Sequence, residues 1–147
     1  MVTDSVVSTT RLNVMRALYF LMAFMLGAMV WPPLLRQSGE MNHMHGVAVS
    51  MFCALTIVSA LGIRYPLQML PVLLFEFAWK TIWLLAIGLP HYFAGSLAGG
   101  NAATFKDNTV GIVLCIIAIP WGYAWRTYAR QPGERWLRRR NAAPATA

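Results

Sequence analysis

Four apolar blocks, separated by short polar segments, dominate the pattern of hydrophobic and polar positions along the chain. They lie at about residues 15–35, 46–63, 67–89 and 109–125. Roughly 23 residues in the third block, at about 1.5 Å each, give a helix of ~34 Å, enough to cross the ~30 Å hydrocarbon core of a bilayer. The blocks lack the amphipathic spacing of helices in a soluble bundle. The pattern therefore predicts an all-α, single-domain membrane bundle of four transmembrane helices.

The first block follows Arg11 and Arg16, a basic flank that also precedes the apolar core of signal peptides. Its apolar run is at the long end for a signal peptide. No A-x-A cleavage site follows, and Pro32 and Pro33 come directly after the run. We therefore expect an uncleaved first span, followed by a loop over residues 32–45.

The connections between the other blocks differ in length. Residues 64–66, Arg-Tyr-Pro, link the second and third blocks so tightly that the two helices should be antiparallel neighbours. Pro90 should end the third helix, and residues 90–108 should form a long loop, either flexible or re-entrant. Pro120 lies inside the fourth block and should kink its helix.

Small residues at four-residue spacing predict close helix contacts in a membrane. The first block has the pair Ala23 and Gly27, and the second has a ridge of Gly46, Ser50 and Ala54. Side-chain hydroxyls inside a span are tolerated when they bond to their own backbone. This arrangement is expected for Ser50, Thr56 and Ser59.

Composition supports the membrane interpretation. The chain has 147 residues, of which 58% are hydrophobic, and its mean hydropathy is +0.53, too apolar for an ordinary soluble domain. The two cysteines, Cys53 and Cys115, both lie within apolar blocks and form no CxxC or zinc-binding pattern. We interpret both as packing residues.

The net charge of +7 would suggest nucleic-acid binding in a soluble protein. Here most of the excess lies in a basic tail, residues 126–147, beside the last apolar block. No folded recognition element accompanies it, so nucleic acid is not the expected partner. Contact with the lipid bilayer and its anionic headgroups is the preferred interpretation. The candidate headgroup residues are Arg135, Arg138, Arg139 and Arg140, in a short basic surface helix over 133–140.

The basic residues also predict the topology. In a four-span protein, Arg11, Arg16, Arg64 and the tail arginines fall on one side. Arg36 and Lys106 fall on the other side. The positive-inside rule then places both termini in the cytoplasm. We expect a multi-pass protein of the bacterial inner membrane.

One pair of charges lies at the centre of the third block. Glu76 and Lys80 are four residues apart, on one helical face and in the favourable order. Trp83 continues this stripe and Trp79 flanks it. Each charge costs ~2.5–3.5 kcal/mol at a bilayer centre, so the stripe should face other helices or a polar cavity. Its role would be a proton relay, a polar substrate contact, a lock on a partner helix, or a neutral pair that fixes packing.

A second group of polar residues falls on the predicted outer side: Glu40, His43, His45 and His91. Imidazoles with a carboxylate could bind a transition metal. Interfacial hydrogen bonding is the simpler interpretation, and no metal is assigned. If a haem or quinone docks on this side, His45 and His91 are the first residues to test.

Several features resemble the DoxX-like group of small bacterial membrane proteins. They are the four short spans, His45-Gly46 at the start of the second, the tight turn at residues 62–66, and the aromatic-rich third span. The resemblance covers the second and third spans best and brings no catalytic motif. Some members are similar to a membrane subunit of thiosulfate:quinone oxidoreductase, and others are linked to thiol redox balance. The resemblance thus implies an accessory or quinone-side role.

The expected function is that of a small inner-membrane protein, an accessory or quinone-linked subunit without a soluble catalytic domain. Its partners would be membrane proteins or further copies of itself. One alternative is a small proton-coupled transporter that uses Glu76. Another is a membrane-embedded enzyme that acts on an apolar substrate, with the outer histidines as acid and base. The common nucleotide-binding and hydrolase signatures are absent from the sequence.

Overall fold

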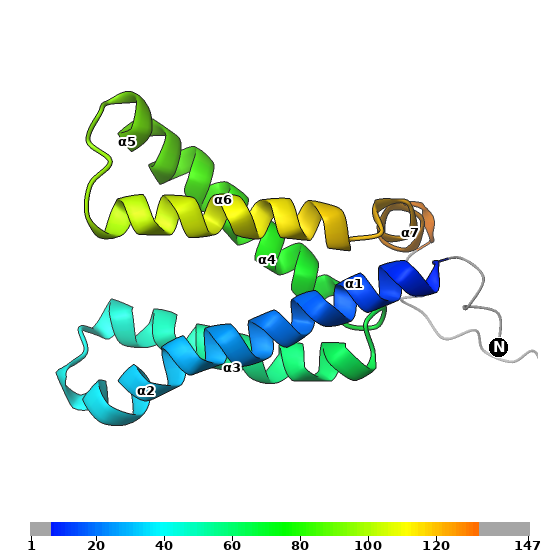
Figure 1. The fold of residues 1–147 in the computed structure, drawn as a ribbon, viewed down its shortest axis with the longest axis horizontal. Coiled ribbons are helices and arrows are strands. Elements are labelled where there is room, and N and C mark those ends of the chain that lie inside the picture. The colour runs from blue at the N-terminus through cyan, green and yellow to red at the C-terminus, as the bar shows by residue number, and fades with distance from the viewer. Residues whose placement is uncertain (1–6, 133–147) are drawn as a thin grey trace, which may run out of the picture.

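The computed structural model describes residues 7–132, which are helical apart from short connections and contain no strand (Figure 1). The α-helices are α1 (Thr9–Phe20), α2 (Gly27–Gln37), α3 (His43–Arg64), α4 (Leu70–Trp83), α5 (Leu89–Phe93), α6 (Gly100–Ala118) and α7 (Trp121–Ala124). Three wider, π-helical segments continue them, η1 (Leu21–Leu26), η3 (Leu84–Gly88) and η4 (Trp125–Arg130), and a short 3₁₀ turn is η2 (Ser38–Glu40). The all-helical fold class is confirmed for this part of the chain.

The helices form two antiparallel hairpins (Figure 1). In the first, α1, η1 and α2 pack along α3, and in the second, α4 packs along α6. The turn between α3 and α4 joins the hairpins, and α1 also packs on α6. In Figure 1 the hairpins converge at the end that carries the start of α1 and α7, and spread apart at the other end.

The convergent end holds the hydrophobic core. Its buried residues come from both hairpins and include Met15, Leu18, Tyr19, Met22, Leu55, Leu70, Leu73, Cys115, Ala118 and Ile119. The ring of Tyr19 lies against Gly62 so closely that a Cβ at that position has no room. The Tyr19 hydroxyl donates a 3.2 Å hydrogen bond to the carbonyl of Pro66. Tyr19 thus fastens the first helix to the α3–α4 turn.

The first helical run continues from Thr9 to Glu40, so the predicted loop over 32–45 is wrong. Pro32 and Pro33 lie inside α2. A proline in a helix lacks the N–H that bonds to the preceding turn, but membrane helices tolerate it where tertiary contacts hold the helix. Such a contact lies directly before the prolines, where the Trp31 indole N–H donates to the Thr56 hydroxyl at 3.1 Å.

The predicted loop over 90–108 is also wrong. The third helix passes Pro90 and ends at Phe93, and α6 already begins at Gly100. Pro90 lies inside this continuous run, directly after the π-helical segment η3. The connection is therefore only the segment 94–99, in which Gly95 and Gly99 adopt positive φ angles that glycine permits.

The predicted kink at Pro120 is confirmed and is larger than a bend within one helix. Ile119 before it is extended, as pre-proline sterics favour. The helix resumes at Trp121, with its axis turned by 73°. By length and composition, three helical runs are apolar enough to cross a membrane, Thr9–Glu40, His43–Arg64 and Leu70–Phe93, or four if the bent pair is one span.

The predicted small-residue contacts divide into two outcomes. Gly27 is buried and faces Thr56 of α3, but a Cβ there would lie at an ordinary van der Waals distance of 3.8 Å, so the contact forms without requiring glycine. The ridge on α3 does not pack within the chain, because Ser50 and Ala54 are exposed. That ridge instead borders a shallow hollow of about 600 Å³ between η2 and α3.

The predicted hydroxyl bonds also divide. Thr56 donates to the backbone carbonyl of Cys53 at 2.7 Å, as expected. Ser59 is buried, and its hydroxyl has no partner among residues 7–132, so that prediction is wrong. Cys53 and Cys115 are both buried and free, which agrees with packing roles.

Candidate functional site

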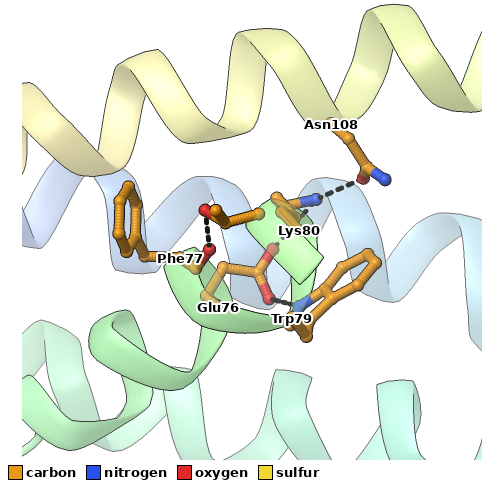
Figure 2. A network of polar contacts seen from close by, with 6 residues as sticks. Glu76, Phe77, Trp79, Lys80 and Asn108 are labelled. Carbon is orange, nitrogen blue, oxygen red and sulfur yellow. Dashed lines mark hydrogen bonds and ion pairs between the residues drawn. The ribbon is translucent and has the colours of Figure 1, made fainter. Parts of the chain in front are cut away.

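The charged pair of the third helix forms a buried ion pair (Figure 2). Glu76 and Lys80 lie one turn apart on α4, and the carboxylate Oε1 is 3.1 Å from the ammonium Nζ. The side chains are only 7% and 14% exposed, respectively. The two charges neutralise each other, which lowers the cost of burying them.

Trp79 contacts both members of the pair. Its indole N–H donates to the second carboxylate oxygen of Glu76 at 2.6 Å. The ammonium of Lys80 lies 4.4 Å from the centre of the Trp79 ring, a cation–π distance. Both oxygens of the Glu76 carboxylate are therefore engaged by neighbours on the same helix.

Helix α6 supplies the rest of the network. Lys80 donates to the side-chain oxygen of Asn108 at 3.3 Å. A Cβ at Gly111 would lie 2.7 Å from the Cε of Lys80, so the lysine stem lies directly on the backbone of α6. Asn108 and Gly111 are three residues apart and share one helical face. The network therefore holds α4 and α6 together.

The network has one unsatisfied group. Asn108 is 2% exposed, and its amide nitrogen is buried without a hydrogen-bond partner in the described part of the chain. In Figure 2 this nitrogen points away from Lys80.

The hydroxyl of Thr81, near the pair, donates to the carbonyl of Phe77 at 2.7 Å and so bonds within its own helix.

Trp83 belongs to another contact. It is half-buried, and its ring lies beside Gly88, where a Cβ would come 3.0 Å from Trp83 and 2.9 Å from Phe105. Trp83 therefore packs where η3 meets α6. The four residues of the predicted stripe therefore do not form one site. Trp79 belongs to the polar network, whereas Trp83 makes an apolar contact with η3.

An apolar groove lies between α3 and α4, with a volume of about 560 Å³. Its lining is Ala48, Met51, Phe52, Ala54, Leu55, Val58, Pro71, Val72, Phe75 and Trp79. The only polar atom among these side chains is the indole nitrogen of Trp79, which already donates to Glu76. Phe52 meets Trp79 edge-on, with ring centres 5.4 Å apart. Trp79 thus belongs to both the groove and the polar network.

The outer residues are not assembled into one site. Glu40, His43 and His45 are exposed around the connection between α2 and α3. His91 is half-buried in α5, with its Nδ1 at 3.5 Å from the hydroxyl of Ser96. Figure 1 shows the two segments at the same end of the molecule but on different hairpins. Across residues 7–132, no three His, Cys, Asp or Glu side chains are grouped so as to hold a metal ion.

The sequence prediction missed Asn108 and Gly111. Residues 100–108 are rich in small and polar side chains, so they resemble a loop, and Asn108 was its last residue. The sequence does contain one signal for this site: Asn108 and Gly111 are three residues apart, directly before and within an apolar block, so in a helix they share one face. The predicted headgroup residues Arg135, Arg138, Arg139 and Arg140 lie outside the described residues.

Comparisons with family models, curated proteins and solved structures gave no match to this chain. The resemblance to the DoxX-like group therefore stays a prediction from the sequence.

Proposed function

We propose that this chain is a multi-pass protein of the bacterial inner membrane, with both termini in the cytoplasm, that serves as an accessory, quinone-linked subunit. Three or four of its helical runs are long and apolar enough to cross a bilayer. Large apolar side chains are exposed on every long helix, among them Phe20, Phe24, Met25, Met29, Ile57, Leu61, Ile82, Leu85, Ile116 and Ile117. In water so much exposed apolar surface would promote aggregation, whereas lipid acyl chains solvate it.

The charges support the same orientation. Arg11 at the start of α1, Arg64 at the end of α3 and Arg126 in η4 belong to segments at the convergent end. Arg36 and Lys106 belong to the other end. The charged pair inside the bundle is neutral as a unit. This is the distribution that the positive-inside rule associates with a cytoplasmic convergent end.

The groove between α3 and α4 is the observation that carries the quinone link. Its volume is in the range of small-molecule sites. Since its one polar lining atom is already bonded, the groove recognises apolar shape and offers no hydrogen bond. Met51, Val58 and Phe75 in its lining are exposed, so a molecule dissolved in the bilayer reaches it from the side. A membrane quinone is such a molecule, and its isoprenoid tail is the part that would fill the groove.

The two alternative functions fit the geometry less well. A transporter that carries protons on Glu76 needs a carboxylate that solvent or substrate can reach, but both oxygens are engaged and the side chain is buried. An enzyme that uses the outer histidines needs His43 or His45 beside His91, and these lie on separate hairpins.

The test compares two substitutions on α3. Ala48→Phe places a ring in the groove, whereas Ala60→Phe adds the same ring at an exposed position outside its lining. Quinone retained by the detergent-purified chain is measured by mass spectrometry of a solvent extract. We expect the wild type and Ala60→Phe to retain quinone, and Ala48→Phe to lose most of it. No quinone in any of the three, or equal amounts in both variants, would refute the quinone link.

A further inference from the structure

The segment after Pro120 does not continue the direction of the fourth long helix. Helix α6 ends at Ala118, and the axis of Trp121–Arg130 is turned from it by 73°. In Figure 1 α6 runs along the molecule, whereas α7 is seen almost end-on. If α6 crosses the bilayer, a helix at this angle lies close to the plane of the membrane surface. The segment therefore has the direction of an interfacial helix.

The segment carries three exposed aromatic residues, Trp121, Trp125 and Tyr128. Trp121 and Trp125 are four residues apart, about one helical turn, so they lie on the same side. Ala124 is buried, and Tyr123 is half-buried. The segment thus has an exposed aromatic face beside a face that packs on the rest of the chain.

Trp121 shows which way the aromatic face points. Its indole N–H donates to the carbonyl of Ile116, in the last turns of α6, at 3.1 Å. Its ring meets Phe77 of α4 edge-on, with centres 5.2 Å apart. Trp121 therefore points back along α6 toward the apolar body. Trp125 lies one turn further along on the same side, so it faces the hydrocarbon side of the surface.

The same segment carries two exposed arginines, Arg126 and Arg130. Arg126 directly follows Trp125, so its side chain leaves the helix about a quarter turn away from that of Trp125. The Nε of Arg126 donates to the carbonyl of Gly122 at 3.0 Å, which fixes the direction of the guanidinium. A fixed planar guanidinium is suited to pairs of phosphate oxygens.

Among the described residues, the end of the molecule around this segment is also positively charged. Arg11 and Arg64 belong to the segments that meet there. The acidic residues in the part of the chain that the structure describes lie elsewhere: Glu40 and Asp107 belong to the opposite end, and Glu76 is inside the bundle. A positive surface at the predicted cytoplasmic face complements anionic lipid headgroups.

We propose that Trp121–Arg130 is an amphipathic helix that lies in the cytoplasmic surface of the bilayer and binds anionic phospholipid headgroups through Arg126 and Arg130. Trp125 anchors it at the boundary between headgroups and acyl chains. The proposal rests on the membrane insertion proposed above, but not on the quinone link.

Spin labels on the full chain in vesicles of equal parts phosphatidylcholine and phosphatidylglycerol test the orientation. Single cysteines replace Trp125, Arg126 and Arg130 in turn, in a background that lacks the two native cysteines. Collision with oxygen relative to a water-soluble nickel complex reports depth. We expect a several-fold higher ratio at 125 than at 126 and 130. A ratio that changes steadily from 125 to 130 would show a continuing span and overturn the proposal.

A reference label separates this result from failure of membrane insertion. Ile117 is exposed near the end of α6, and a label there should have the high oxygen ratio of a lipid-facing position. If that label instead collides mainly with nickel, the proposed insertion of α6 is itself wrong. The high ratio at 117 together with a steady trend over 125–130 would overturn only the interfacial helix.

Bound lipid tests the role of the arginines. The double variant Arg126→Gln with Arg130→Gln is compared with Arg36→Gln with Lys106→Gln, which removes the same charge at the other end. Native mass spectrometry gives the ratio of bound phosphatidylglycerol to phosphatidylcholine. About fivefold loss of preference per interfacial arginine is expected in the first variant. Equal ratios in the two double variants would refute headgroup binding by Arg126 and Arg130.

Discussion

Removal of one member of the buried ion pair should destabilise the protein far more than removal of both. In Lys80→Met the Glu76 carboxylate keeps only the indole N–H of Trp79 as a partner. At the observed 3.1 Å, the lost attraction is ~5 kcal/mol for an effective dielectric constant of ~20. Broken buried pairs cost ~3–5 kcal/mol in other proteins, which agrees with this estimate.

The companion variants follow from the same contacts. Glu76→Gln keeps an acceptor for Trp79 but leaves the Lys80 ammonium with Asn108 and the ring, so we expect a loss near ~3 kcal/mol. The double variant Glu76→Gln with Lys80→Met has no buried charge. Its main defect is the oxygen of Asn108, which loses its donor at a cost of ~1–3 kcal/mol.

The assay is the free energy of unfolding of each variant, from denaturant titration in mixed detergent micelles. Lys106→Met removes an exposed lysine from α6 and is the control, with an expected effect within ~0.5 kcal/mol. The loss of unfolding free energy in the double variant should be smaller than the sum of the two single losses by at least ~3 kcal/mol. Losses that add would show that Glu76 and Lys80 do not stabilise each other, and would refute the argument from their geometry.

The topology, the packing of Lys80 on α6 and the link between the ion pair and the groove each give a further prediction. A reporter fused after Ala147 should behave as cytoplasmic and one inserted between Gly99 and Gly100 as periplasmic; the reverse pattern would overturn the proposed topology. Gly111→Leu should displace the Lys80 stem and cost ~1–3 kcal/mol of unfolding free energy, whereas Gly100→Leu, in open space on the same helix, should cost less; equal losses would contradict the close contact. In the double variant Glu76→Gln with Lys80→Met, the glutamine still accepts a hydrogen bond from Trp79, whereas in Glu76→Leu with Lys80→Met it does not. The second variant should therefore retain less quinone. Equal retention by mass spectrometry would show that the ion pair does not influence the groove.

The features that could be predicted from the sequence depend on neighbours along the chain. Glu76 and Lys80 meet because four residues span one helical turn, which holds wherever the helix lies. The helical class follows from the length and apolar character of the blocks. The break at Pro120 follows from local sterics, since Ile119 takes the extended backbone that a following proline favours.

The features that could not be predicted depend on contacts between helices. Pro32, Pro33 and Pro90 have the same local chemistry as Pro120 but lie within helical runs. The first two follow a tryptophan that is bonded to α3, and Pro90 follows the wider turns of η3. The polar residues around Asn108 predict a loop, whereas packing of α6 on α4 makes this segment helical. Local composition does not contain that packing.

The ion pair acts on the groove through Trp79. The ring of Trp79 lines the groove, and its N–H is fixed by Glu76, which in turn is neutralised by Lys80. A molecule that displaced the ring would break a hydrogen bond to a charged group, which costs ~1.5–3 kcal/mol. The groove wall is therefore held in shape by charges that the groove itself does not expose. An apolar site gains a fixed outline in this way without an unbonded polar atom on its surface.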